Sequence, residues 1–98
     1  MIIEKKQDGT HLDIALEGRL DTMTAPELEK EFSRSLAGVD TLTLDFSRVE
    51  YISSAGLQAL LIAHSMMRGK GGMKILHPNE IVMEVFDVTG FSGMLTIE

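Results

Sequence analysis

The chain has 98 residues, which is enough for one hydrophobic core but too few for two lobes around a deep active-site cleft. We therefore expect a single domain over residues 1–98, with the 44% hydrophobic and 24% charged residues typical of globular proteins. The absence of cysteine excludes disulfides and thiolate metal sites. The formal net charge of −6 argues against nucleic acid as a direct partner, because proteins that bind it concentrate Lys and Arg in a patch.

The start of the sequence and its apolar runs indicate neither export nor membrane insertion. Met1 leads directly into a polar strand, without the basic and apolar regions of a signal peptide. The longest apolar run, residues 55–63, is interrupted by Gly56 and Gln58 and is far shorter than the roughly 20 residues that span a bilayer. We therefore expect a cytoplasmic protein that does not insert into membranes.

The hydrophobic pattern predicts strands and helices in the order ββαβαβαβ. In chain order, the expected elements are a strand over residues 2–6, a strand over 11–17, a helix over 25–36, a strand over 41–46, a helix over 55–68, a strand over 73–76, a helix opened by residues 78–80 and closed by 89–90, and a strand over 94–97. The Asp8-Gly9 pair between the first two strands is a strong hairpin signal. The later strand–helix–strand units require right-handed crossovers, so we predict an α/β fold: a mixed, mostly parallel sheet with an N-terminal hairpin and packed α-helices.

The first helix carries several start signals. Thr22 or Thr24 can serve as its cap, and Pro26 stands in the first turn, where a missing N–H has no cost. Glu27 follows Thr24 by three residues, as in a capping box. The predicted inner stripe of this helix consists of the apolar residues Leu28, Phe32 and Leu36, with Ser35 as a further candidate.

Residues 45–57 run from a buried strand through a turn into a helix that opens with Ser53 and Ser54. The first N–H groups of a helix lack internal partners and favour negative charge, so a phosphate on one of these serines would be stabilised there. Phosphorylation would change the local charge by about −1.5 to −2. The small residues Ala55 and Gly56 would let another protein approach the hydroxyl. Plain helix capping by serine, which contributes about 1 kcal/mol, is the alternative.

Two aspartates are candidate companions of this serine turn. Asp21 and Asp45 are both predicted at or near the carboxyl ends of strands, the edge at which ligands gather in parallel sheets. Asp21 fits equally well as a simple turn or cap residue.

Catalysis and cofactor binding find little support in the sequence. Ser54 lacks the G-x-S-x-G elbow of a nucleophilic serine, and His11, His64 and His77 show neither a pairing with it nor the spacing of metal ligands. Residues 69–72 lack the Walker pattern of a phosphate-binding loop. They follow a predicted helix instead of preceding one, so we expect them to end that helix. We expect no catalytic residue, no metal and no cofactor, and therefore no enzyme.

In four segments the chain resembles the STAS domain family, and within it the stand-alone anti-sigma factor antagonists of bacteria. The resemblance covers essentially the whole chain and is carried by Glu17-Gly18-Arg19-Leu20-Asp21, Leu44-Asp45-Phe46-Ser47-Arg48-Val49, Ile52-Ser53-Ser54-Ala55-Gly56-Leu57 and Val88-Thr89-Gly90-Phe91. It implies a phosphoprotein in which an anti-sigma factor serine kinase phosphorylates Ser54 and a PP2C-type phosphatase removes the phosphate. The unphosphorylated protein then binds the anti-sigma factor and frees the sigma factor for transcription.

The resemblance also implies a docking surface and one departure from the family pattern. Asp21, Ser53, Ser54, Ala55 and Gly56 are expected to contact the partner. Ser53 stands where the best-studied pattern has an aspartate, so the phosphoacceptor is kept and its acidic neighbour is absent. A non-phosphorylated STAS adaptor in a membrane transport or signalling complex is the alternative function. The sequence leaves both a monomer and a weak dimer open.

Overall fold

The computed structural model describes residues 1–98 and confirms the predicted α/β fold. In chain order the elements are β1 (Ile2–Asp8), β2 (His11–Leu20), α1 (Ala25–Ser35), β3 (Thr41–Ile52), α2 (Ser54–Met66), β4 (Gly72–Leu76), α3 (Glu80–Thr89), the short 3-10 helix η1 (Phe91–Gly93) and β5 (Thr96–Ile97). The order of strands and α-helices is therefore the predicted ββαβαβαβ. None of the helices is long and apolar enough to cross a membrane.

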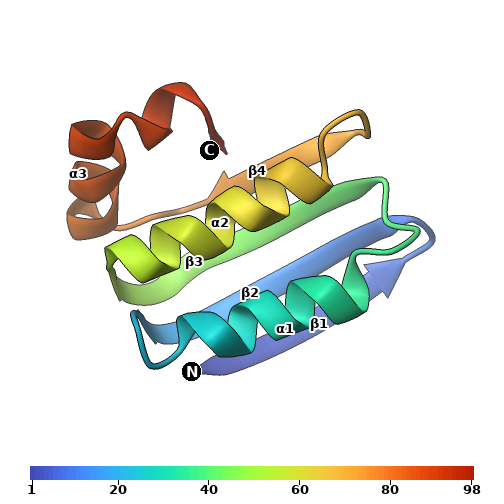
Figure 1. Cartoon of the computed structure of the whole chain (residues 1–98), viewed down its shortest axis with the longest axis horizontal. Coiled ribbons are helices and arrows are strands. Elements are labelled where there is room, and N and C mark those ends of the chain that lie inside the picture. The colour runs from blue at the N-terminus through green and yellow to red at the C-terminus, as the bar shows by residue number, and fades with distance from the viewer.

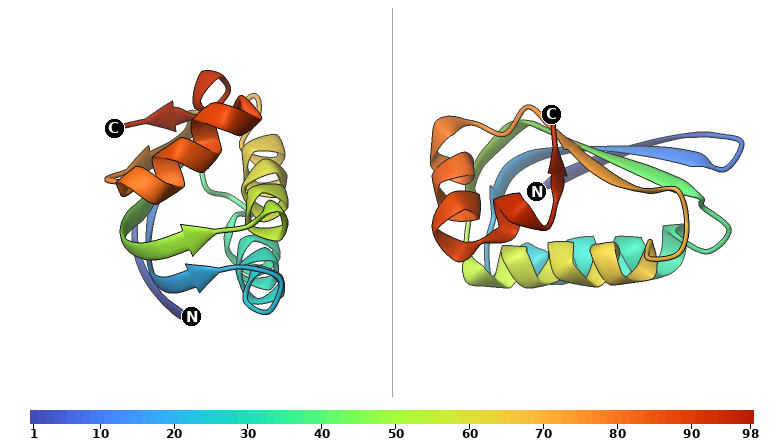
Figure 2. Two further views of the ribbon diagram at one scale, coloured as in Figure 1. Left: turned by 90° about the vertical axis from the view of Figure 1, so that its left-hand side faces the viewer. Right: turned by 90° about the horizontal axis from the view of Figure 1, so that it is seen from above.

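The five strands form one sheet in the order β1-β2-β3-β4-β5. β1 and β2 are antiparallel, and each following pair is parallel. Figure 1 shows α1 and α2 side by side over one face of the sheet, and the end-on view in Figure 2 shows that these two helices leave the opposite face open. α3 packs against β3 beyond the N-terminal end of α2 (Figure 1).

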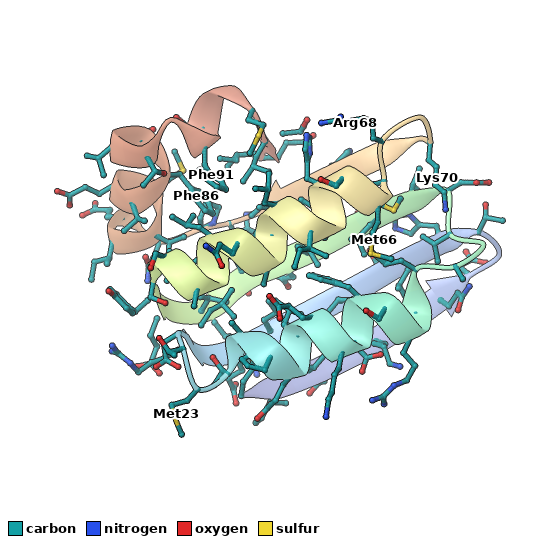
Figure 3. All side chains as sticks on the ribbon, in the orientation of Figure 1. Met23, Met66, Arg68, Lys70, Phe86 and Phe91 are labelled. Carbon is teal, nitrogen blue, oxygen red and sulfur yellow. The ribbon has the colours of Figure 1, made fainter.

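The core lies between the sheet and the helices and contains 24 buried apolar residues. In β2, Leu12, Ile14 and Leu16 are buried at alternating positions, as the period of two requires. The predicted inner stripe of α1 is confirmed, since its apolar members are all buried: Leu28, Phe32 and Leu36. The rings of Phe46 and Phe86 lie 6.2 Å apart and join β3 to α3. Phe86 and Phe91 point from the C-terminal segment toward the sheet (Figure 3).

The main departure from the predicted elements is the length of β3, which continues to Ile52 instead of ending at Phe46. Ser47 and Arg48 are both exposed, so the buried-exposed alternation breaks there. The pairing of β2 with β3 shifts register at two places in the same region, between Ala15 and Glu17 and between Gly18 and Arg19. Such bulges place two outward residues in succession and make a continuing strand look like a turn.

The last strand is also shorter than predicted. β5 contains only Thr96 and Ile97, because Phe91–Gly93 form a 3-10 turn before it. The prediction of a strand over 94–97 is therefore wrong in its first half.

Candidate functional site

The carboxyl ends of β2 and β3 bring the two predicted site segments together. Leu20 pairs with Ile52 across the two strands, and the backbone N–H of Ser53 donates to the Leu20 carbonyl at 2.9 Å. The chain leaves both strands at this point. The turn that contains Asp21 and the start of α2 consequently lie next to each other at one edge of the sheet (Figure 1).

The two serines have different environments. Ser53 occupies the N-cap position in extended conformation, but its side chain makes no capping hydrogen bond and its Oγ atom is buried without a partner. Ser54 is the first residue of α2 and is exposed. The capping interpretation is therefore wrong for this helix. Of the two hydroxyls, that of Ser54 is the one another molecule can reach.

The start of α2 favours an anion. No acidic residue stands in its first turn, and no side chain caps its first N–H groups. These N–H groups have no partners inside the helix, and the helix dipole adds a partial positive charge. A phosphate on Ser54 would therefore meet unneutralised donors, the usual setting for anions at helix starts.

Gly56 is required by packing inside the molecule. A Cβ atom at this position would lie 2.7 Å from Ile52 Cγ1 and 2.8 Å from both Leu20 Cγ and the Leu20 carbonyl oxygen. The residue is buried, and the missing side chain lets α2 start close to the ends of β2 and β3. This corrects the view that Gly56 opens the serine to a partner. Ser54 itself is exposed, whereas Ala55 is half-buried against the core.

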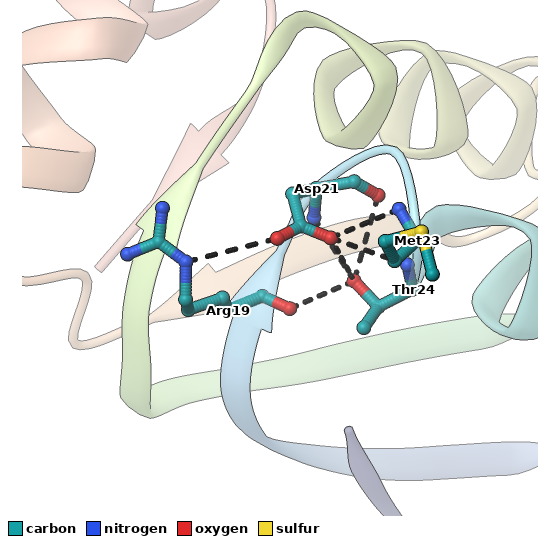
Figure 4. Close-up of polar contacts among 4 residues, drawn as sticks. All are labelled: Arg19, Asp21, Met23 and Thr24. Atoms are coloured by element: carbon teal, nitrogen blue, oxygen red, sulfur yellow. Dashed lines mark hydrogen bonds and ion pairs between the residues drawn. The ribbon is translucent and has the colours of Figure 1, made fainter.

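Asp21 organises the adjoining turn (Figure 4). Its Oδ1 accepts the backbone N–H groups of Met23 at 3.0 Å and Thr24 at 3.3 Å. The Thr24 hydroxyl donates to the Arg19 carbonyl at 2.7 Å and accepts the Asp21 N–H at 2.9 Å. Thr24 thus stands at the N-cap of α1 without capping it through its side chain, and the predicted capping box with Glu27 is not formed.

The Asp21 carboxylate is held in its charged form. Desolvation alone would raise its pKa, but hydrogen bonds from Met23 and Thr24 and the Arg19 guanidinium outweigh this effect. The net result is a pKa below the ordinary aspartate value. The edge therefore pairs a fixed negative charge with the accessible hydroxyl of Ser54.

Comparison with known proteins decides the family. The chain matches the family described as "Mlab, STAS domain" over residues 3–96. It belongs to the STAS domain family. BtrV of Bordetella bronchiseptica, named as an anti-sigma factor antagonist, is 33% identical over 94 residues, which span 94% of this chain and 80% of BtrV.

Solved STAS structures confirm the fold. The anti-sigma factor antagonist SpoIIAA in its unphosphorylated form superposes with a TM-score of 0.85 at 20% identity, covering 99% of this chain and 88% of SpoIIAA. The phosphorylated form of SpoIIAA from Bacillus superposes with a TM-score of 0.75 at 19% identity, covering 99% of this chain and 91% of that protein. At these identities the likeness establishes the fold alone.

Three further residues at this edge of the sheet, Arg19, Tyr51 and Met23, were not singled out from the sequence. Arg19 pairs with Tyr51 in the sheet and places its guanidinium carbon 4.5 Å from the centre of the Tyr51 ring. Its Nε lies 3.7 Å from Asp21 Oδ2, so Arg19 links the Asp21 turn to β3. Met23 is 83% exposed and projects from the same turn into solvent (Figure 3). Only the strand register, which the bulges disguise, could have indicated the Arg19–Tyr51 pair.

Asp45 does not belong to this edge, contrary to the sequence-based prediction. Because β3 continues to Ile52, Asp45 lies in the middle of the strand, on the open face of the sheet. Its Oδ1 accepts the Ser47 N–H at 2.9 Å, and this hydrogen bond is the main cause of its lowered pKa. Asp45 lines a surface cavity of about 280 Å³ together with Glu17 and Arg48, which form an ion pair of 3.2 Å.

The remaining candidate groups do not converge on Ser54. No hydrogen bond joins Ser54 to a histidine, so its hydroxyl lacks an adjacent base. His11 is engaged elsewhere, with Nδ1 2.6 Å from the Thr41 hydroxyl and Nε2 2.9 Å from Asp13. No group of three or more His, Asp and Glu side chains is placed to hold a metal ion.

Proposed function

We propose that this STAS domain is an anti-sigma factor antagonist whose binding to an anti-sigma factor serine kinase is switched by phosphorylation of Ser54. It acts by binding and not by catalysis. The observation that carries the proposal is the exposed, uncommitted hydroxyl of Ser54 at the start of α2, beside the fixed charge of Asp21. The naming of BtrV as an anti-sigma factor antagonist supports the choice of partner.

The geometry favours Ser54 over Ser53 as the phosphoacceptor. The Ser53 Oγ atom is buried, so a kinase would have to open the start of α2 to reach it. Ser54 is exposed and needs no such opening. The loss of the family aspartate at position 53 therefore leaves the acceptor hydroxyl in place.

The switch changes the surface of the domain and leaves its fold intact. The helix start holds the phosphate, which adds a charge of about −1.5 to −2 at the edge of the sheet that also carries the Asp21 turn (Figure 1). In the docked state both groups lie within the contact, where like charges and desolvation oppose binding. The unphosphorylated domain consequently binds the kinase and releases the sigma factor. A PP2C-type phosphatase restores this state.

The test uses purified candidate anti-sigma factor kinases from the source genome, with and without ATP. Kinase-bound and free pools of the domain are separated, and each is analysed by mass spectrometry. We expect phosphate on Ser54 in the free pool, and at least about tenfold weaker binding of the isolated phosphoprotein.

Two variants serve as matched controls for this test. Ser54→Ala should bind whether or not ATP is present, whereas Ser53→Ala should be phosphorylated and released like the wild type. Phosphate on Ser53 with Ser54 unmodified, or equal phosphorylation of both pools, would reject Ser54 as the switch. Kinase-independent binding to a transport or signalling protein would then favour the adaptor function.

A further inference from the structure

Helix α2 has an unusual composition for a surface helix. Between Ser54 and Met66 it contains no Asp, Glu, Lys or Arg, in a chain with 24% charged residues. Its outward side exposes three large apolar residues, Leu61 and Ile62 at 41% each and Met66 at 37%. A helix that is apolar on both sides is normally covered on both sides.

The exposed residues of α2 form one continuous face that begins at the serine. They recur at intervals of three and four residues, the spacing of one helix face: Ser54, Gln58, Leu61, Ile62, Ser65 and Met66. The buried residues occupy the opposite side, against the sheet: Leu57, Ala59, Leu60 and Ala63. At 1.5 Å per residue, this outward face is about 20 Å long.

The far end of α2 carries positive charge that nothing inside the molecule neutralises. Arg68 and Lys70 follow the helix directly, and Figure 3 shows both at its C-terminal end. Neither takes part in any of the five ion pairs or in a side-chain hydrogen bond. In a protein with a formal net charge of −6, these two cations give the C-terminal end of α2 a local positive charge.

We propose that the outward face of α2 is a single docking strip, defined as Ser54, Leu61, Ile62 and Met66 with Arg68 and Lys70 at its end. Its occupant is the anti-sigma factor kinase, so the inference rests on the proposed function. The kinase surface that fits has an apolar groove about 20 Å long. That groove ends in acidic side chains opposite Arg68 and Lys70 and opens at its other end to the phosphate donor.

The exposed area favours this occupant over a second copy of the chain. Together the three apolar side chains expose little more than the equivalent of one whole side chain. A stable dimer buries about 800 Å² on each partner, which this strip alone does not supply. The kinase must contact Ser54 to phosphorylate it, and the docking strip extends that same contact along α2. The strip then fixes the direction in which the domain lies on the kinase.

The test measures binding of unphosphorylated variants to the purified kinase that phosphorylates Ser54, by calorimetry at low and at high salt. Replacing Leu61 and Ile62 by serine should weaken binding by about tenfold or more. Arg68→Glu should weaken binding at low salt, and added salt should reduce this effect. The controls are Val88→Ser, which alters a 78% exposed apolar residue on α3, and Arg34→Glu on α1. Both controls should bind like the wild type.

The outcomes separate this inference from the proposed function. If the wild type binds and is phosphorylated on Ser54 while the Leu61/Ile62 variant behaves identically, the docking strip is rejected and the switch stands. If the wild type itself does not bind any candidate kinase, the proposed function fails and the strip fails with it. Concentration-dependent dimerisation of the wild type that the Leu61/Ile62 variant loses would assign the face to a second copy and reject the kinase as its occupant. Unchanged thermal midpoints of all variants confirm that they are folded.

Discussion

At the scale of single residues, the site depends on how two adjacent serines and a glycine are used. The sequence singled out Ser53, Ser54 and Gly56, but it could not show which hydroxyl is buried. That distinction arises from the pairing of Leu20 with Ile52, which turns the Ser53 side chain inward. The same pairing brings Leu20 and Ile52 so close to Gly56 that no side chain fits there, and the sequence around Gly56 does not reveal this contact.

The buried, unpaired hydroxyl of Ser53 leads to a prediction that opposes the usual behaviour of N-cap serines. Replacing a capping serine by alanine ordinarily costs about 1 kcal/mol. Here no capping bond is lost and an unsatisfied buried oxygen is removed, which relieves part of its desolvation penalty. Ser53→Ala should therefore leave the free energy of unfolding unchanged or raise it by about 1 kcal/mol. Urea unfolding measures the change, and a loss of 1 kcal/mol or more would mean that the hydroxyl does cap α2.

Gly56 gives a second prediction, in which two effects oppose each other. Alanine is favoured over glycine in a helix by about 1 kcal/mol. At position 56, however, its methyl group would lie 2.8 Å from the Leu20 backbone oxygen, which cannot move without disturbing β2. We expect Gly56→Ala to destabilise the domain by about 1–3 kcal/mol.

The matched control for this variant is Gly93→Ala in η1. Nothing lies within 4 Å of a Cβ atom at Gly93, so this variant should retain the stability of the wild type. Equal unfolding free energies of the two variants in denaturant would show that the close approach of α2 to Leu20 is not required.

At the scale of elements, the hydrophobic pattern predicts most of the fold and fails where packing departs from regular periodicity. The alternation in β2 and the apolar stripe of α1 are sufficient to identify both elements, although β2 continues to Leu20 instead of ending at Glu17. The end of β3 was missed because bulges expose Ser47 and Arg48 in succession. The misplaced strand end also explains why Asp45 was assigned to the wrong edge. The capping residues of α1 were misassigned because the Thr24 hydroxyl bonds to Arg19 at the end of β2 and to Asp21 in the turn.

The part of β3 beyond its predicted end at Phe46 is hydrogen-bonded to the start of α3. The Asn79 amide donates to the carbonyls of Val49 at 3.1 Å and Glu50 at 3.3 Å, and its Oδ1 accepts the Val82 N–H at 2.8 Å. One side chain therefore caps α3 and connects it to the C-terminal part of β3. Asn79→Ala should destabilise the domain by about 1–3 kcal/mol, since it loses the cap and both donors.

A conservative variant separates the two roles of Asn79. Asn79→Asp keeps the acceptor for the Val82 N–H but cannot donate to Val49 and Glu50. Its stability should lie between those of Asn79→Ala and the wild type, as measured by chemical denaturation. Wild-type stability of Asn79→Asp would show that the tie to β3 contributes nothing.

At the scale of the whole molecule, acid stability depends on a small set of carboxylates. Asp21, Glu31 and Asp45 all have pKa values lowered by the fold. For Glu31, hydrogen bonds from Lys5 and Ser35 are the main causes, and the bond from Lys5 joins β1 to α1. The net charge of the whole chain also changes with pH: it is formally −6 at pH 7, reaches zero near pH 4.9 and is positive in stronger acid.

Glu31 allows the two opposing effects of pH to be separated. Its folded-state pKa lies below that of the unfolded chain, so its contribution to stability is complete above about pH 4.5 and is lost as the pH falls through the lower, folded-state value. Glu31→Gln cannot ionise and lacks this contribution at every pH. The thermal midpoint of the wild type should therefore exceed that of Glu31→Gln at pH 7, and the difference should shrink below about pH 4. Circular dichroism melts of both proteins between pH 7 and pH 2 measure the difference directly, and the general loss of negative charge cancels because it affects both. A difference that stays constant or widens in acid would mean that the Lys5–Glu31 contact does not couple protonation to folding.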